Sequence, residues 1–153
     1  MALKRVLVAV DLRGATNEIV KAAVQIAQPH GAEMILFTVV SAGPGVNPFG
    51  EAPDGRTNEA VLNADAFDDL EPFALVVERA GLAVQRDLGH GDPRQGIQQA
   101  IERHQPDLVV VGTHARTGLA RLVLGSVAEF VLRVSPVPVL VVRSAATGLD
   151  PGE

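Results

Sequence analysis

Short apolar runs alternate along the chain with segments in which apolar residues recur every three or four positions. Consecutive apolar, largely β-branched residues are typical of strands covered on both faces, whereas spacing of three and four is typical of amphipathic helices. The runs predict strands at residues 6–10, 34–40, 82–88, 108–111 and 137–142, and the periodic segments predict helices at residues 19–27, 62–80, 93–105 and 126–133. Five strands and four helices are therefore expected in strict alternation.

Glycine, proline and aspartate set several of the expected boundaries. Gly31, two residues after a proline, ends the first helix, and Pro72 indicates a bend or break in the second. Asp92 is a favourable N-cap with Pro93 in the first helical position, so the third helix has a firm start. Gly112 is expected to terminate the fourth strand.

Alternation of strands and helices with right-handed crossovers predicts a parallel sheet between two helical layers. The third strand is interrupted by Gln85, Arg86 and Asp87, which favours a place at the sheet edge. The pattern indicates one domain over residues 1–143, followed by a mobile tail over residues 144–153 that has no periodicity.

Ligands of open α/β sheets bind beyond the carboxyl ends of the strands, where the strand order reverses. The segment from Gly112 to Val127 leaves a buried strand, and its Gly125–Ser126 pair opens the next helix. Helix N-termini present free N–H groups and partial positive charge, and glycine lets an anion approach the backbone. This edge of the sheet is therefore the expected ligand-binding site, with Arg116 and Arg121 as additional sources of positive charge.

Composition narrows the possible functions. The 153 residues include no cysteine, which excludes disulfides, iron–sulfur clusters and thiol catalysis and suits a reducing cytoplasm. A net charge of −5 with only 3% aromatic residues argues against nucleic-acid binding. No window approaches the ~20 apolar residues of a membrane span, and the first apolar run is too short for a signal peptide.

The sequence contains no recognised catalytic motif. It lacks a Gly-x-x-x-x-Gly-Lys-[Ser/Thr] loop, a Gly-x-Ser-x-Gly elbow and a His-Glu-x-x-His pair. His114 is the only histidine at the expected site, and no partner lies at metal-ligand spacing. A phosphoacceptor receiver domain needs an acidic pair after the first strand and a lysine near the last, but only Asp11 follows the first strand and both lysines lie in the first 21 residues. A Rossmann dehydrogenase is disfavoured because no Gly-x-Gly-x-x-Gly follows that strand. We therefore expect a binding protein rather than a dedicated enzyme.

Five segments resemble the universal stress protein family in the same order. They are residues 6–11, 91–93, 107–114, 125–129 and 136–143. The resemblance implies a Rossmann-like three-layer α/β/α fold of the adenine nucleotide alpha hydrolase-like type, with a five-stranded, mainly parallel sheet in the order 3-2-1-4-5. It also implies a stress-response regulatory protein that binds ATP or AMP, with Mg²⁺ as a possible companion.

The nucleotide-binding members of that family carry Gly, two residues, Gly, nine residues, then Gly and Ser or Thr. Gly112, Gly125 and Ser126 match this motif in the present chain, whereas Ala115 replaces the second glycine. The resemblance implies that Asp11 and Val39 contact adenine or ribose. Ribose and phosphates would be held by Val111, Gly112, Gly125, Ser126 and Val127, and the expected site also includes Ala9, Val10, His114, Ala115 and Arg116.

Simpler interpretations of the same residues stay open. If position 115 needs a positive φ, alanine costs about 1 kcal/mol, and its methyl group could instead block the ligand. The alternative is then a dimer that acts through protein partners without nucleotide. Ser126 with Glu129 also forms a capping-box sequence, Gly112 could serve a turn, and Asp11 could cap a helix.

The last predicted strand, residues 137–142, is apolar and would be an exposed edge if it lies outermost. Only Pro136 and Pro138 would oppose pairing with another chain. Pairing with its own copy across a two-fold axis would bury the strand, and the family resemblance implies the same contact. A homodimer through residues 137–142 is therefore expected.

Overall fold

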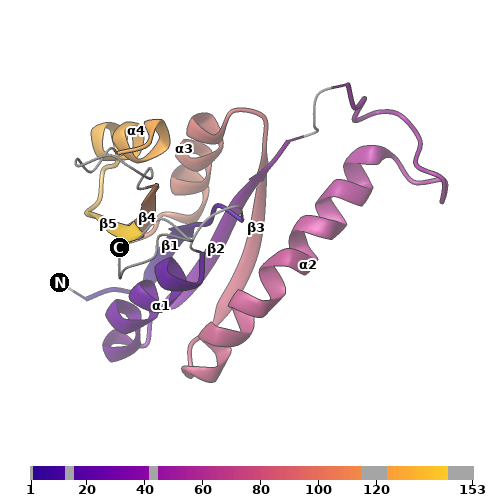
Figure 1. Ribbon diagram of the computed structural model, residues 1–153. Helices are drawn as coiled ribbons and strands as arrows, with labels where there is room; N and C mark the ends of the chain where they lie inside the picture. The colour runs from indigo at the N-terminus through magenta and orange to yellow at the C-terminus, as the bar shows by residue number, and fades with distance from the viewer. Residues whose placement is uncertain (1, 13–15, 42–44, 115–123, 145–153) are drawn as a thin grey trace, which may run out of the picture.

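A parallel sheet separates two layers of helices in the computed structural model, which describes residues 2–12, 16–41, 45–114 and 124–144 (Figure 1). The elements in chain order are β1 (Arg5–Ala9), α1 (Thr16–Ala27), the short 3-10 helix η1 (Gln28–His30), β2 (Glu33–Val40), α2 (Asn58–Arg79), β3 (Val84–His90), α3 (Pro93–His104), β4 (Leu108–His114), α4 (Ser126–Val134) and β5 (Val139–Ser144). The five strands are ordered β3-β2-β1-β4-β5, and every pairing between them is parallel. The predicted fold class and strand order are confirmed, including the edge position of β3.

Each face of the sheet packs on its own pair of helices (Figure 1). Val6 and Val8 lie in one core with residues of α1 and α2, whereas Leu7 lies in the other with residues of α3 and α4. Successive residues of a strand point to opposite faces, so a strand between two helical layers must be apolar at every position. This explains the uninterrupted apolar runs of the sequence.

Strand register brings the carboxyl ends of the three central strands to one edge. Ala9 of β1 pairs with Phe37 of β2, and Val8 pairs with Val110 of β4. The Val10 N–H donates to the Phe37 carbonyl at 2.8 Å, which continues the β1–β2 pairing beyond β1. The segments that follow β1, β2 and β4 therefore begin side by side.

Several expected boundaries proved wrong. Strand β3 spans Val84–His90 rather than residues 82–88, and helices α1 and α2 begin at Thr16 and Asn58, before the expected residues 19 and 62. Gly112 does not terminate β4, which continues to His114. The last strand spans Val139–Ser144 rather than residues 137–142. The shift follows from a local turn, in which the Val137 N–H donates to Ser135 Oγ at 3.2 Å and Ser135 Oγ donates to the Val137 carbonyl at 2.7 Å.

Helix α2 is one continuous element of 22 residues, so Pro72 does not break it. Buried residues on both sides of Pro72, Leu70 before it and Ala74 after it, pack into the same core. Packing of this apolar face outweighs the hydrogen bond that proline removes from the helix.

Candidate functional site

A cleft of about 1010 Å³ opens at the carboxyl ends of the strands. We call it the carboxyl-end cleft. Nine of the predicted site residues line it: Ala9, Val10, Asp11, Val39, Val111, Gly112, Gly125, Ser126 and Val127. The volume is at the upper end of the range typical of small-molecule sites, roughly 300–1,000 Å³.

The remaining three predicted site residues are His114, Ala115 and Arg116. His114 ends β4, and Ala115 and Arg116 lie outside the described residues, as do Arg121 and residues 145–153 of the expected tail. The structure thus places the segments after β1, β2 and β4 around one cleft, together with the start of α4.

Helix α4 directs its N-terminus at the cleft. Gly125 is its N-cap with an extended backbone, φ −67° and ψ 161°, and the Glu129 N–H donates to the Gly125 carbonyl at 3.0 Å. Ser126 is therefore the first helical residue, and the capping-box interpretation in which its side chain accepts from the Glu129 N–H is wrong. The N–H groups of the first turn have no acceptor within an α-helix and carry partial positive charge, so this end can receive an anion.

Space around the two motif glycines differs. A methyl group placed on Gly125 would meet no atom within 4 Å among the described residues, so none of them crowds this position. A methyl group on Gly112 would overlap Cδ1 of Ile19 from α1. Gly112 is therefore required for packing of α1 on β4, and the interpretation that it serves a turn is wrong.

The first loop of the cleft is held by a hydrogen bond from helix α1. Thr16 Oγ1 donates to the Asp11 carbonyl at 2.6 Å, and Thr16 is only 3% exposed. The backbone of Asp11 is thereby fixed at the end of β1, while the residue as a whole is exposed and lines the cleft.

Between these polar groups the cleft is apolar. Phe37 and Val39 of β2 line it, and Phe37 is only 1% exposed. Two glycines make room for these side chains, because a methyl group at Gly89 would lie 2.6 Å from the Phe37 ring and one at Gly96 would lie 2.9 Å from Val39 Cγ2. Helix α3 can therefore lie close to β2 and close one wall of the cleft.

Sequence reasoning missed several lining residues. They include Phe37 of β2, Ala66 and Asp69 of α2, and Gly91, Pro93 and Ile97 at and just before the start of α3. Those after β3 could have been found, since all carboxyl ends of a parallel sheet share one edge. Asp69 had no such signal, because a carboxylate on an exposed helix face is ordinary.

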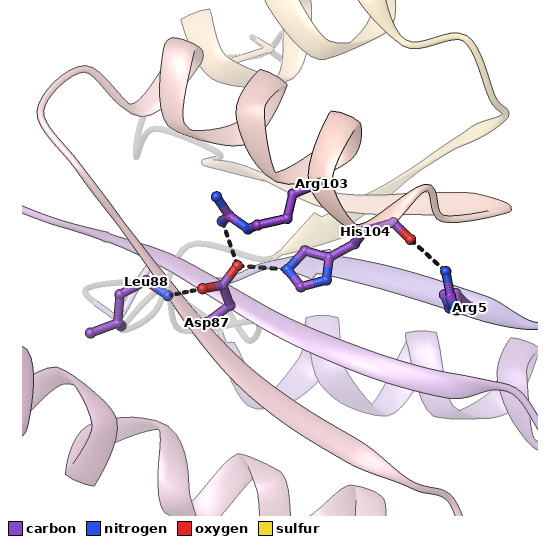
Figure 2. Close-up of polar contacts among 5 residues, drawn as sticks. All are labelled: Arg5, Asp87, Leu88, Arg103 and His104. Carbon is purple, nitrogen blue, oxygen red and sulfur yellow. Dashed lines mark hydrogen bonds and ion pairs between the residues drawn. The ribbon is translucent and has the colours of Figure 1, made fainter.

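A polar cluster away from the cleft joins β3 to the end of α3 (Figure 2). Asp87 Oδ2 accepts from His104 Nε2 at 2.6 Å and from Arg103 at 2.5 Å, and Asp87 Oδ1 accepts from the Leu88 N–H at 2.9 Å. The His104 carbonyl accepts from Arg5 of β1 at 3.0 Å. Burial would raise the pKa of Asp87, but the hydrogen bonds from His104 and Arg103 outweigh it and hold that pKa below its ordinary value of 3.8. The cluster ties three elements together and has a structural role.

Two other kinds of feature, a metal site and a membrane span, are absent from the part of the chain that the structure describes. Within the described ranges no group of three or more His, Asp or Glu side chains is placed to hold a metal ion. In the same part of the chain, no helix has both the length and the apolar character needed to cross a membrane.

The fold and the cleft define an α/β protein with a ligand-sized site at the carboxyl ends of a parallel sheet. The model of the universal stress protein family matches residues 2–143, and the chain belongs to this family. Universal stress protein MJ0531 of Methanocaldococcus jannaschii is 31% identical over 140 residues, which cover 92% of this chain and 82% of that protein.

Solved structures of the family share the fold. The universal stress protein UspA from Lactobacillus plantarum superposes with a TM-score of 0.73 at 24% identity, over 94% of this chain and 99% of that one. An Arabidopsis thaliana family member with AMP bound gives 0.66 at 20% identity, over 98% and 99% of the two chains. A universal stress protein in complex with cAMP gives 0.67 at 24% identity, over 95% and 100%.

Proposed function

We propose that this protein is a regulatory binding protein of the stress response that holds ATP or AMP in the carboxyl-end cleft. One observation carries the proposal: Asp11, Val39 and the Gly125–Ser126 start of α4 line the same cleft. An apolar surface for a base and a helix N-terminus for phosphate are the two features that a nucleotide needs. AMP and cAMP in solved structures of this fold support the same ligand class.

The proposal assigns phosphate to the start of α4 and the base to the apolar surface at Val39. Ribose then lies between them, near Asp11 and Gly112. Magnesium would accompany ATP through its phosphates, as it does in most nucleotide sites. We assign binding rather than turnover, and expect any hydrolysis of ATP to be slow. Among the described lining residues there is no lysine or histidine to act on a phosphate.

Isothermal titration calorimetry with AMP, and with ATP and magnesium, tests the function. Dissociation constants in the micromolar range are expected. Affinity in the millimolar range or no heat of binding would overturn the nucleotide assignment.

A second candidate is favoured by Ala115, which replaces a glycine of the family's nucleotide-binding motif. In this alternative the alanine methyl group closes the cleft to nucleotide, and the protein acts as a homodimer on protein partners. The variant Ala115→Gly separates the two candidates. Binding that appears only in this variant supports the alternative, whereas similar binding by both proteins supports the nucleotide function.

We also propose that the protein forms a homodimer through β5. The Val109 N–H donates to the Pro138 carbonyl at 3.1 Å. In a parallel ladder the N–H and C=O groups of every second residue point to the same neighbouring strand, so those of Leu140 and Val142 point toward β4. The backbone groups of Val139 and Val141 then face outward from the sheet. Leu140 and Val142 pack against one core and Val139 and Val141 against the other, so a partner strand would extend both cores.

A further inference from the structure

We propose that Thr16 of α1 is a positioning residue for the nucleotide: by donating a hydrogen bond to the Asp11 carbonyl, its hydroxyl holds Asp11 in the conformation that binds the ligand. The inference rests on the proposed function. It adds a residue that sets ligand affinity without touching the ligand, since Thr16 is 3% exposed and does not line the carboxyl-end cleft, whereas Asp11 does.

The backbone at Asp11 is held from two directions. Strand β1 ends at Ala9, and the Val10 N–H donates to the Phe37 carbonyl at 2.8 Å, so the chain follows β2 as far as Val10. Immediately after this point the Asp11 carbonyl accepts from Thr16 Oγ1 at 2.6 Å. Asp11 is thus placed by the sheet before it and by α1 through its own carbonyl.

Helix α1 is in turn fixed against another wall of the cleft. Ile19 lies one turn after Thr16, so the two side chains share a face of the helix, and both residues are buried. Ile19 packs so closely on Gly112 of β4 that a methyl group at position 112 would overlap Cδ1 of Ile19. The first turn of α1 therefore connects Asp11 with Gly112, the two positions near which ribose is proposed to lie.

A wall that is fixed before binding strengthens binding, because less conformational freedom is lost when the ligand arrives. Without the hydroxyl of Thr16, the segment at Asp11 would populate several conformations, and only some of them would place its carboxylate for the ligand. The apparent affinity falls with the fraction of the chain in the binding-competent conformation. Loss of this one hydrogen bond should therefore weaken AMP binding by roughly three- to tenfold.

The test is calorimetry with AMP on the wild type, T16V and T16S. Thr16→Val has nearly the same shape as the wild-type side chain and removes the donor, so AMP affinity should fall roughly three- to tenfold. Thr16→Ser keeps the hydroxyl and should bind AMP within about twofold of the wild type. Because Asp11 is exposed, water can replace the lost donor, so T16V should fold, which circular dichroism checks.

Thr57→Val is the matched control for stability. The Thr57 hydroxyl accepts from the Ala60 N–H at 3.1 Å at the start of α2, and Thr57 does not line the cleft. Like T16V, this variant loses a threonine hydrogen bond at the start of a helix, so its stability should fall while its AMP affinity stays unchanged. An equal loss of affinity in T57V would overturn the role of Thr16, because the effect would then be one of general stability.

The dependence on Asp11 is tested with Asp11→Ala, alone and combined with Thr16→Val. If Thr16 acts by placing the Asp11 side chain, the loss of affinity caused by T16V should be clearly smaller in the D11A background. NMR titration measures millimolar affinities and extends the comparison to weak binders. An equal loss in both backgrounds would show that Thr16 does not act through Asp11 and would overturn the inference.

The outcomes distinguish this inference from the proposed function. AMP binding by the wild type with the same affinity in T16V would overturn the role of Thr16 alone. A loss in T16S as large as that in T16V would likewise overturn it, because the hydroxyl would then not be the group that matters. Lack of AMP binding by the wild type would overturn the proposed function, and this inference with it.

Discussion

Gly112 of β4 lies directly against Cδ1 of Ile19 of α1, so that a side chain at position 112 would occupy the space of that methyl group. Ile19 is 5% exposed and belongs to the core on that face of the sheet. The glycine therefore has a packing role that does not depend on a ligand.

The first prediction concerns this contact. Gly112→Ala should lower the free energy of unfolding by about 1–3 kcal/mol through overpacking. In an Ile19→Val background, which removes Cδ1, the same substitution should cost clearly less. Urea denaturation of the four proteins gives the coupling energy. Additive effects of the two substitutions would contradict the contact.

The second prediction concerns Gly125, the other motif glycine, which is not crowded by described atoms as Gly112 is. Gly125→Ser adds a side chain where no described atom lies within 4 Å and supplies a better N-cap, so stability should stay the same or rise by a few tenths of a kcal/mol. If phosphate binds at the start of α4, AMP affinity should fall at least roughly tenfold, because the side chain fills the space of the anion. Denaturation and calorimetry on the same sample measure both. Unchanged AMP affinity would show that the anion binds elsewhere.

The third prediction concerns acid stability. Burial of Asp87 opposes its ionisation, yet hydrogen bonds from His104 and Arg103 hold its pKa below 3.8 in the folded state. A carboxyl with a lowered folded pKa contributes stability above its unfolded pKa, and this contribution is lost as the pH falls through the folded pKa. The wild type should therefore lose stability below about pH 4.

Asp87→Asn should remove that contribution, at a cost of about 1–3 kcal/mol at pH 7. Its stability should then vary less than that of the wild type between about pH 5 and pH 2.5. Asp68→Asn, which removes a carboxylate from the exposed face of α2, controls for net charge. The pH dependence of stability is measured by thermal unfolding. Parallel curves for wild type and D87N would refute the contribution of the Asp87 carboxylate to stability.

The fourth prediction concerns the proposed dimer. Val141→Pro removes an N–H that faces outward from the sheet and leaves the β4–β5 ladder intact, so the protein should become a folded monomer. Leu140→Pro removes an N–H that faces β4, and it should lower stability instead. Light scattering after size exclusion gives the mass of each. A wild-type monomer, or a dimeric V141P, would rule out pairing through β5.

Much of the fold could be predicted because it follows from local pattern. Buried strands between helical layers need apolar residues at every position, which the run at residues 6–10 displays. Asp92 was a recognisable cap, and its carboxylate accepts from the Arg94 N–H at 2.9 Å. Charged residues in β3 marked it as an edge strand.

The errors arose where distant parts of the chain decide the outcome. Position 112 must be glycine because Ile19, far earlier in the sequence, packs against it, and no local sequence pattern indicates that contact. The helix start at Ser126 was predicted correctly, but its cap is the extended backbone of Gly125, which a capping-box sequence does not reveal.

The ionic side chains of β3 have a consequence for assembly. Arg86 pairs with Glu71 at 2.8 Å, Asp87 with Arg103 and His104, and His90 approaches Glu59 at 3.9 Å, so the ionic side chains of this edge strand have partners from its own chain. A strand added beyond β3 would lie beside these charged side chains, and charges on an edge strand oppose such pairing. In the proposed dimer through β5 both outer borders would be β3 strands, so further growth of the sheet by strand addition would be disfavoured.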